Sequence, residues 1–510
     1  MTIDDAGAAA AGASVLSPAE VRAIIAGLML AILLGALDQT IISVSLPRMA
    51  TELQGVHLLA WVVSGYLIAM AVAAPIYGKL GDIYGRRAVL SSAIVLFLVA
   101  SVACALAPTM PTLVAARILQ GLGGGGLISV AQATIADVVS PRERGRYQAY
   151  ISGAFAVASV AGPVLGGVLT QYLSWRWVFW INLPLGLPAL LVTRRAMARL
   201  RRPTAQRQVD YTGAALLTLG LTALLLAITR AGQGQPLIQA GNLGLLIITM
   251  VALTAFVAHA LRTPEPIIPL GLFRNRTVTL SCLVIFVTFI ELVALTVLIP
   301  LELQMLTDAG PDGAALRLIP LSLGVPAGAY MGGRLMAHWG RYKYLQLTGT
   351  LIVPAAVLSL SFISPQASVT MGLCLAMIGV GVGVQLPSST VAVQNAVEHR
   401  HVGIATAVSS FGRSLGSAMG VALMMAWLLL RLNTGADDAG LAITGADIID
   451  TLMGRGAQTA VPDPGALAGA SEQAFRSVYR LAALIALSSV LFTMALKDDS
   501  LDERVPPTAR

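Results

Sequence analysis

Charged side chains are scarce in this chain: Asp, Glu, Lys and Arg make up 11% of its 510 residues, whereas 56% are hydrophobic. A soluble protein carries about a quarter charged residues. One or two cores could not bury this much apolar surface, so lipid is the natural solvent for the chain. The composition therefore excludes an ordinary soluble protein.

Cysteine and histidine are also scarce, which limits the chemistry the chain can perform. Cys104, Cys282 and Cys374 all fall inside apolar stretches, which excludes a disulfide framework and a multi-cysteine metal site. The five histidines lie at the ends of apolar runs or between them, and the apolar runs themselves contain no His-rich or Glu-x-x-His pattern. We therefore expect no metal, no cofactor and no enzymatic activity.

A cleavable signal peptide is also not evident. Residues 1–20 contain Asp4, Asp5 and Glu20, and the first apolar run is longer than the hydrophobic region of a signal peptide. The apolar runs that follow are the dominant feature of the chain. A helix that crosses a bilayer needs about 20 mostly apolar residues.

The apolar runs are too long and too uniform for the alternating strands of a membrane barrel. They predict an all-α integral membrane protein with about fourteen spans. The expected limits are 23–47, 58–77, 87–107, 112–137, 147–170, 176–193, 210–229, 241–261, 277–303, 313–338, 344–362, 369–392, 402–430 and 475–496.

The basic residues predict the orientation of these spans. If the N-terminus is cytoplasmic, most of the 33 Lys and Arg residues fall in cytoplasmic segments, as the positive-inside rule requires. This asymmetry explains the net charge of +8 without a nucleic-acid partner. We expect a bacterial inner-membrane protein that crosses the membrane many times, with both termini in the cytoplasm.

One loop is duplicated. The segment from Gly78 to Arg86 recurs from Gly333 to Arg341: the first and last glycines, the basic residues, the leucine and the aromatic residue coincide, and Asp82 has become Ala337. Two such repeats, related by an axis along the membrane normal, are typical of rocking transporters. The duplication predicts two pseudo-symmetric six-helix bundles. The expected parts are a cytoplasmic tail (1–22), a first bundle (23–193), an Arg-rich linker (194–209), an inserted helix pair (210–261), a second bundle (277–496) with an outer loop (431–474), and a cytoplasmic tail (497–510).

Ionisable residues inside the spans are candidates for proton coupling, because charges at membrane depth are costly and mark proton or substrate paths. Asp38 lies well inside the first span, and Arg117 in the fourth span lies at a comparable depth, so the two could meet. A permanent ion pair is the structural alternative. In the second half, Glu291 either pairs with Arg413 or faces a central cavity, and the sequence does not decide between these.

The duplicated loop is a candidate gate. Asp82 can form charge-assisted contacts with Arg86 or Arg87 that hold one conformation and break in the other, and Gly78 and Gly85 permit tight turns. A positive-inside loop with a stray aspartate is the alternative. Because the second copy lacks the acid, we expect the stronger latch in the first half. Further gating candidates are Gly162, Pro163, Gly166 and Arg341.

Polar and aromatic residues within the spans are candidates for the wall of a substrate cavity. The expected cavity residues are Gln39, Tyr66, Asn182, Phe289, Glu291, Gln385 and Arg413. The glycine-rich run 121–126 is no phosphate loop, because no Gly-Lys-Ser/Thr follows it. Its glycines instead favour close helix packing.

Several of these motifs resemble those of the major facilitator superfamily. Residues 78–87 resemble its loop between helices two and three, 117–121 its helix-four motif and 162–167 the helix-five motif of exporters. Residues 37–47 and 175–186 are similar to sequence motifs of the fourteen-helix drug:proton antiporter branch of this superfamily. The resemblance implies coupling by Asp38 and Arg117, gating by Asp82 and Arg86, and an export-type bend at Gly162–Pro163. Ala158 stands where the exporter motif usually opens with glycine, and we expect little consequence.

The sequence therefore predicts a secondary active transporter that exports small lipophilic compounds, cationic ones included, in exchange for protons. The alternative is a dedicated exporter of an endogenous metabolite, lipid or amino-acid-like solute on the same scaffold. The expected partners are a small-molecule substrate and membrane lipid. A periplasmic adaptor protein is left open, as are the substrate, the stoichiometry and the oligomeric state.

Overall fold

The computed structural model describes residues 17–42, 45–54, 58–199, 209–232, 239–307, 311–398, 401–438, 448–449 and 464–498. They form helices joined by short loops. The first half of the chain, as the term is used below, comprises α2 (Pro18–Ile41), α3 (Leu46–Leu53), α4 (Leu59–Tyr84), α5 (Arg86–Ala105), α6 (Met110–Val138), α7 (Pro141–Tyr172), α8 (Trp177–Trp180) and α9 (Asn182–Ala196).

A pair of helices, α10 (Tyr211–Gly232) and α11 (Ala240–Ala260), stands between the halves in sequence. The second half comprises α12 (Arg276–Leu306), α13 (Pro311–Leu316), α14 (Ile319–Trp339), α15 (Lys343–Leu360), α16 (Ser368–Asn395), α17 (Val402–Asp438) and α19 (Pro464–Met494). Two short 3₁₀ turns, η2 (Met197–Arg199) and η3 (Leu270–Arg274), follow α9 and precede α12.

Twelve helices in the described ranges are long and apolar enough to cross a membrane. The chain is thus an all-helical, multi-pass membrane protein. Two other helices, α7 with 32 residues and α14 with 21, are of spanning length but do not meet the same criterion of apolar composition.

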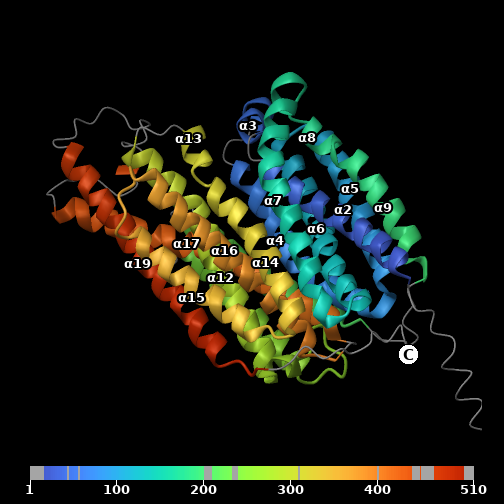
Figure 1. The fold of residues 1–510 in the computed structure, drawn as a ribbon. Coiled ribbons are helices and arrows are strands. Elements are labelled where there is room, and N and C mark those ends of the chain that lie inside the picture. The colour runs from blue at the N-terminus through green and yellow to red at the C-terminus, as the bar shows by residue number, and fades with distance from the viewer. Residues whose placement is uncertain are drawn as a thin grey trace, which may run out of the picture.

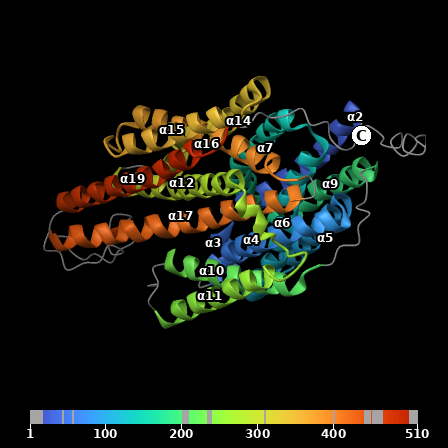
Figure 2. The ribbon, with the colours of Figure 1, turned by 90° about the horizontal axis from the view of Figure 1, so that it is seen from below.

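The two halves form two bundles that lean against each other (Figure 1). Helix α7 packs on α14, and α4 packs on α17, so each half contributes to both contacts. Helices α10 and α11 pack on each other, and α10 also lies against α4 and α17 (Figure 2). The helix pair therefore lies beside one of the two seams between the halves.

Several expected spans have different limits in the structure. The run 23–47 is not one helix, because α2 ends at Ile41 and α3 begins at Leu46. Pro47 lies in the first turn of α3, where proline is favoured because its missing N–H has no helical partner there. The run 176–193 is divided at Ile181 into α8 and α9, and α13 is separate from α14.

The outer loop expected over 431–474 is shorter in the structure. Helix α17 continues to Asp438, and α19 already begins at Pro464. The residues that follow Pro464 are rich in alanine, the best helix former, and proline is favoured in the first helical turn. Residues 439–447 and 450–463 lie outside the described part of the chain.

Both copies of the duplicated loop place a glycine with positive φ at the end of a helix. Gly85 has φ of 88° and Gly340 has φ of 64°, a region that side-chain-bearing residues rarely adopt. Each glycine follows the end of its helix and donates its N–H to a carbonyl four residues back, that of Gly81 or of Met336. A glycine of the repeat therefore ends both α4 and α14, although ψ is 142° at Gly85 and 19° at Gly340, so only Gly340 is a left-handed cap.

The glycine-rich part of α6 allows α4 and α5 to approach closely. A Cβ at Gly121 would lie 2.3 Å from the Tyr66 carbonyl oxygen, and one at Gly123 would lie 2.7 Å from the Phe97 nitrogen. Small residues let membrane helices pack backbone against backbone. This packing fixes the position of Arg117, one turn before Gly121 on α6.

Candidate functional site

A buried ion pair lies inside the first bundle. Arg117 Nη1 on α6 donates to Asp38 Oδ2 on α2 at 2.7 Å. The Asp38 side chain is 0% exposed and that of Arg117 is 2% exposed. The structure thus brings together the two charges whose meeting the sequence suggested.

Two amides hold the second oxygen of Asp38. Gln120 Nε2 donates to Asp38 Oδ1 at 2.8 Å, and Asn182 Nδ2 donates to the same oxygen at 2.9 Å. Asn182 Nδ2 also donates to Ser101 Oγ at 2.9 Å. Buried carboxylates persist only when their lone pairs are satisfied in this way. The network therefore joins four helices, α2, α5, α6 and α9.

The arginine of this pair has partners of its own. The Arg117 guanidinium carbon lies 4.0 Å from the centre of the Tyr66 ring, a cation–π distance. Its Nε donates to the Val62 carbonyl at 3.2 Å, and Nη1 also donates to Gln120 Oε1 at 2.7 Å. If the carboxylate were neutralised, Arg117 would still be held to α4.

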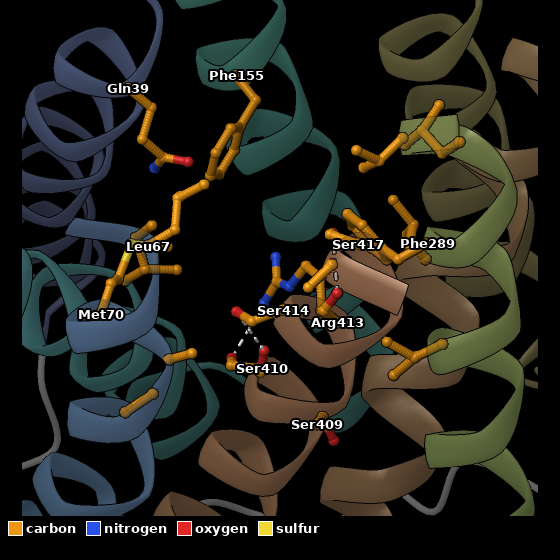
Figure 3. Close-up of a pocket in the computed structure, with 18 of the residues that line it drawn as sticks. Gln39, Leu67, Met70, Phe155, Phe289, Ser409, Ser410, Arg413, Ser414 and Ser417 are labelled. Atoms are coloured by element: carbon orange, nitrogen blue, oxygen red, sulfur yellow. Dashed lines mark hydrogen bonds between the residues drawn. The ribbon is translucent and has the colours of Figure 1, made fainter. Parts of the chain in front are cut away.

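A cavity of about 680 Å³ lies between the two halves. Side chains such as Leu67, Met70, Phe155 and Phe289 give it apolar walls (Figure 3). One end is polar and is built by α17. We call this the polar end, and it consists of Ser409, Ser410, Arg413, Ser414 and Ser417.

Asp38 and the residues that line the cavity lie on different faces of α2. Gln39 and Thr40 line the cavity, whereas Asp38 points into the first bundle. Successive residues of an α-helix point about 100° apart, so neighbours in sequence can serve different surroundings. A change at Asp38 can therefore reach the cavity through α2 itself.

Four of the expected cavity residues do not line the cavity. Tyr66 and Asn182 are buried in the first bundle around the Asp38 network. Gln385 accepts a hydrogen bond from Thr288 at 2.6 Å within the second bundle, and Glu291 is 1% exposed. The expected cavity residues that do line it are Gln39, Phe289 and Arg413.

Glu291 and Arg413 adopt neither arrangement left open by the sequence. Glu291 is absent from the cavity wall, and its Oε1 is buried without a hydrogen-bond partner among the described residues. Arg413 Nη2 instead donates to Gln132 Oε1 at 3.2 Å and to Ser410 Oγ at 3.0 Å. The two residues from Phe289 to Glu291 rotate the side chain by about 200° around the helix, which is enough to move the carboxylate away from the cavity.

The expected latch forms in the first half and has three members. Arg86 Nη2 lies 2.6 Å from Asp82 Oδ1, and Arg86 Nε lies 2.8 Å from Asp137 Oδ2 on α6. From here on, the latch means Asp82, Arg86 and Asp137. Arg86 makes these contacts and Arg87 does not, because Arg87 is one position further round α5. Lys79 pairs with Glu265 at 3.8 Å.

The latch lies where α4 meets α17 of the other half. A Cβ at Gly78 would lie 2.6 Å from that of Ala407, and one at Gly403 would lie 2.4 Å from Asp82 Oδ1. Without side chains at these glycines the two helices touch closely. The latch therefore closes one end of the space between the halves.

The equivalent residue in the second half has another partner. Arg341 Nη1 binds Asp498 Oδ2 at 2.9 Å, beyond the end of α19. The Arg341 side chain is 54% exposed, whereas that of Arg86 is 9% exposed. The second copy thus ties α14 to the C-terminal segment of its own half.

Glycines of α7 form a close contact with α2. A Cβ at Gly162 would lie 2.1 Å from Thr40 Oγ1, and one at Gly166 would lie 2.2 Å from the Ile41 carbonyl oxygen. Thr40 Oγ1 also donates to the Ala158 carbonyl at 2.8 Å. This contact lies next to the cavity residues of α2. The side chain of Pro163 is outside the described part of the structure.

The sequence interpretation missed four residues of the site: Ser101, Gln120, Gln132 and Asp137. Gln120 stands three residues after Arg117, so the two share a helix face, and that spacing could have indicated it. Asp137 lies in a segment that recurs in the second half of the sequence, where Asn395 stands at the equivalent position. Ser101 and Gln132 carry no signal of this kind in a single sequence.

Comparison with known proteins identifies the family. The model of the Major Facilitator Superfamily matches residues 28–421. An uncharacterized MFS-type transporter of Mycobacterium tuberculosis is 35% identical over 413 residues, which cover 81% of this chain and 60% of that protein. Multidrug transporter protein MdtP of Bacillus subtilis is 30% identical over 402 residues, 79% of this chain and 74% of the relative.

Solved structures agree in fold. The human organic anion transporter MFSD10 superposes with a TM-score of 0.63 at 16% identity, covering 94% of this chain and 100% of that one. The proton:xylose symporter XylE gives 0.62 at 17% identity, with 96% and 99% covered. The chain therefore belongs to the Major Facilitator Superfamily and is a multi-pass membrane protein.

Proposed function

We propose that this chain is a secondary active transporter that exports small lipophilic compounds in exchange for protons. The observation that carries the proposal is the buried Asp38–Arg117 pair beside a largely apolar cavity. Ionisable residues at membrane depth mark proton paths. Relatives named as multidrug proteins, such as MdtP and multidrug resistance protein 3 of Bacillus subtilis, at 31% identity for the latter, support the export of lipophilic compounds.

In this mechanism, a proton binds the Asp38 carboxylate and neutralises it. The ion pair with Arg117 is then lost, while Arg117 keeps the Tyr66 ring, the Val62 carbonyl and Gln120 as partners. Helix α2 is then held less tightly to α6, and Gln39 and Thr40 can move with it at the cavity. Loading the proton and changing the cavity are thereby the same event.

The latch supplies the second state of the mechanism. With the N-terminus in the cytoplasm, the latch lies at the cytoplasmic end, and its closed form corresponds to a cavity that faces outward. Opening it requires Arg86 to leave two carboxylates on α4 and α6. Charge-assisted hydrogen bonds of this kind hold one conformation until the competing state gains enough energy.

The proposed topology has fourteen spans, with α10 and α11 inserted between the two bundles. Helices α7 and α14 are long enough to cross a membrane, and they pack on each other between the halves, where they need less apolar surface. The location in a bacterial inner membrane, the cytoplasmic termini and a periplasmic adaptor as a partner remain predictions from the sequence.

The polar end of the cavity favours a second candidate, a dedicated exporter of an endogenous solute. A wide-ranging exporter of lipophilic compounds needs few fixed polar groups, whereas recognition of one solute needs several. The polar end offers four serine hydroxyls and a guanidinium. Transport of several unrelated dyes would favour the first candidate, and transport of none would favour the second.

The test is proton movement driven by substrate. The purified protein is reconstituted in liposomes that contain a pH-sensitive dye, and ethidium and other dyes are added from outside. The proposal predicts proton movement in the wild type and none in Asp38→Asn. A folded wild type that transports a dye without moving protons would overturn proton coupling.

A further inference from the structure

We propose that the polar end of the cavity binds the anionic group of an amphipathic substrate, such as a carboxylate, while the apolar walls hold its body. This inference rests on the proposed function and specifies its substrate class. It departs from the expectation that the substrates include lipophilic cations. The argument depends on the charges that face the cavity.

The cavity contains one charged residue among the described residues that line it, and its charge is positive. That residue is Arg413, and none of the described lining residues is Asp or Glu. The two acids directly before wall residues in the sequence, Asp38 and Glu291, are instead buried in the first and second bundles. A cation entering the cavity would meet a like charge at low dielectric, which is unfavourable. An anion would neutralise Arg413.

Arg413 is positioned to bind such an anion. One of its nitrogens, Nη2, donates to Gln132 Oε1 and Ser410 Oγ, and its carbon lies 5.5 Å from the centre of the Phe289 ring. Its Nη1 and Nε have no hydrogen-bond partner in the described part of the chain, and they lie at the cavity (Figure 3). A guanidinium presents such N–H groups as a fork that matches a carboxylate.

A second, independent group points to a ligand. The Gln132 side chain lines the cavity and is 2% exposed, and its Nε2 is buried without a hydrogen-bond partner among the described residues. The assignment of its two amide atoms follows from Arg413, because a guanidinium only donates and must face the oxygen. A buried unpaired N–H₂ costs free energy unless an acceptor reaches it.

The serines add hydrogen-bond donors to the site. Ser414 and Ser417 donate to the carbonyls of Ser410 and Arg413 on their own helix. Hydroxyls can rotate, so each can donate to an anion when one is present. The polar end therefore provides a fixed charge, a free amide and adaptable donors, next to walls built of Leu67, Phe155 and Phe289.

The test is equilibrium binding of three ligands that share one aromatic body and differ in charge. They are dansylglycine, an anion, dansylglycinamide, which is neutral, and N-dansylethylenediamine, a cation. Binding to the full-length protein in detergent is followed by dansyl fluorescence. A charge-assisted site predicts that the wild type binds the acid about tenfold or more tightly than the amide, and the cation most weakly.

Two variants and one control test whether the polar end of the cavity causes the preference for the acid. Arg413→Gln should bind acid and amide equally, with amide affinity unchanged, so amide binding reports intact folding. Gln132→Glu places a carboxylate against Arg413 and should remove the preference by a different route. Arg334→Gln removes an exposed charge on α14 and should keep the preference, which controls for net charge.

Three results would overturn the inference: a wild type that prefers the cation, a wild type that binds none of the three, or an acid preference that persists in Arg413→Gln. The measurement needs no proton gradient. Ligand binding could therefore still be measured in a protein that does not couple transport to protons. Intact proton-driven transport without a preference for the acid would reject the anion site and leave the proposed function in place.

Discussion

Arg86 Nε on α5 lies 2.8 Å from Asp137 Oδ2 on α6, so the duplicated loop of the first half is tied to a helix outside the loop. The same guanidinium binds Asp82 at the end of α4. One side chain thus holds three helices at the point where α17 of the second half approaches.

Replacing Arg86 with alanine should open this end of the molecule. Two carboxylates, those of Asp82 and Asp137, would lose their common partner, at a cost of about 3–5 kcal/mol for a buried pair. Each loss of about 1.4 kcal/mol shifts a two-state equilibrium tenfold, so a loss of this size should raise the population of the open state about a hundredfold or more. Spin labels at the exposed positions Tyr84 and Tyr344 should therefore report longer distances.

Arg87→Ala is the matched control for this experiment, because Arg87 is the neighbouring residue and takes no part in the latch. It should leave the distance distribution as in the wild type. Equal distributions in Arg86→Ala and the wild type would show that the latch does not hold the closed state.

The second copy of the loop should contribute much less. Arg341 is half exposed and pairs with Asp498, which is itself accessible to solvent. Exposed ion pairs stabilise by about 0–1 kcal/mol. Arg341→Ala should therefore shift the same label distances little. A shift as large as that of Arg86→Ala would contradict the unequal roles of the two loops.

The contact of α7 with α2 should not tolerate a side chain at Gly166. An added Cβ would meet the backbone oxygen of Ile41, which cannot move away cheaply, and overpacking typically costs about 1–3 kcal/mol. Gly166→Ala should lower the thermal unfolding temperature in detergent and reduce transport. Gly153→Ala on the same helix has open space around it and should have neither effect. A fall of similar size in both variants would reject the packing argument.

Asp210 fastens the start of α10 to the end of α11. Its Oδ1 accepts from the Gly213 N–H at 2.8 Å and lies 2.7 Å from His259 Nε2. Burial raises the pKa of Asp210, but the hydrogen bonds from Gly213 and His259 outweigh it and hold that pKa below its usual value. The lowered pKa means that the ionised carboxylate stabilises the fold above the ordinary pKa of aspartate and that this contribution is lost as pH falls through the folded-state pKa.

Asp210→Ala should accordingly lower the free energy of unfolding by about 0.5–2 kcal/mol, the usual cost of losing an N-terminal cap. Thermal unfolding of the purified protein at neutral pH measures this difference. The gap between wild type and variant should narrow as the pH falls below the ordinary pKa of aspartate and through the lower folded-state pKa of Asp210. A gap that is constant with pH would show that the carboxylate charge contributes nothing.

The apolar runs predicted where most long helices lie, because the length of a span is set by the thickness of the bilayer. Breaks within a run were harder to predict. Ile181 divides α8 from α9 without a glycine or a proline at the break itself, and the extension of α17 to Asp438 depends on residues that are not especially apolar.

The sequence predicted which charges lie in the membrane but not which way they point. In a soluble helix, an apolar stripe marks the buried face, whereas in a membrane both lipid and core are apolar and no stripe is needed. For this reason Gln385 and Glu291 were expected at the cavity although both are buried in the second bundle. Asp38 and Arg117 were paired correctly because few other charges lie at that depth.

The most direct test of coupling through Asp38 compares two transport modes of one variant. Exchange of a labelled dye for unlabelled dye needs no net proton movement, whereas uphill transport driven by a pH gradient does. Using a dye that the wild type transports, Asp38→Asn should retain exchange and lose gradient-driven accumulation. Gradient-driven accumulation that persists in Asp38→Asn would contradict the role of this carboxylate as the proton site.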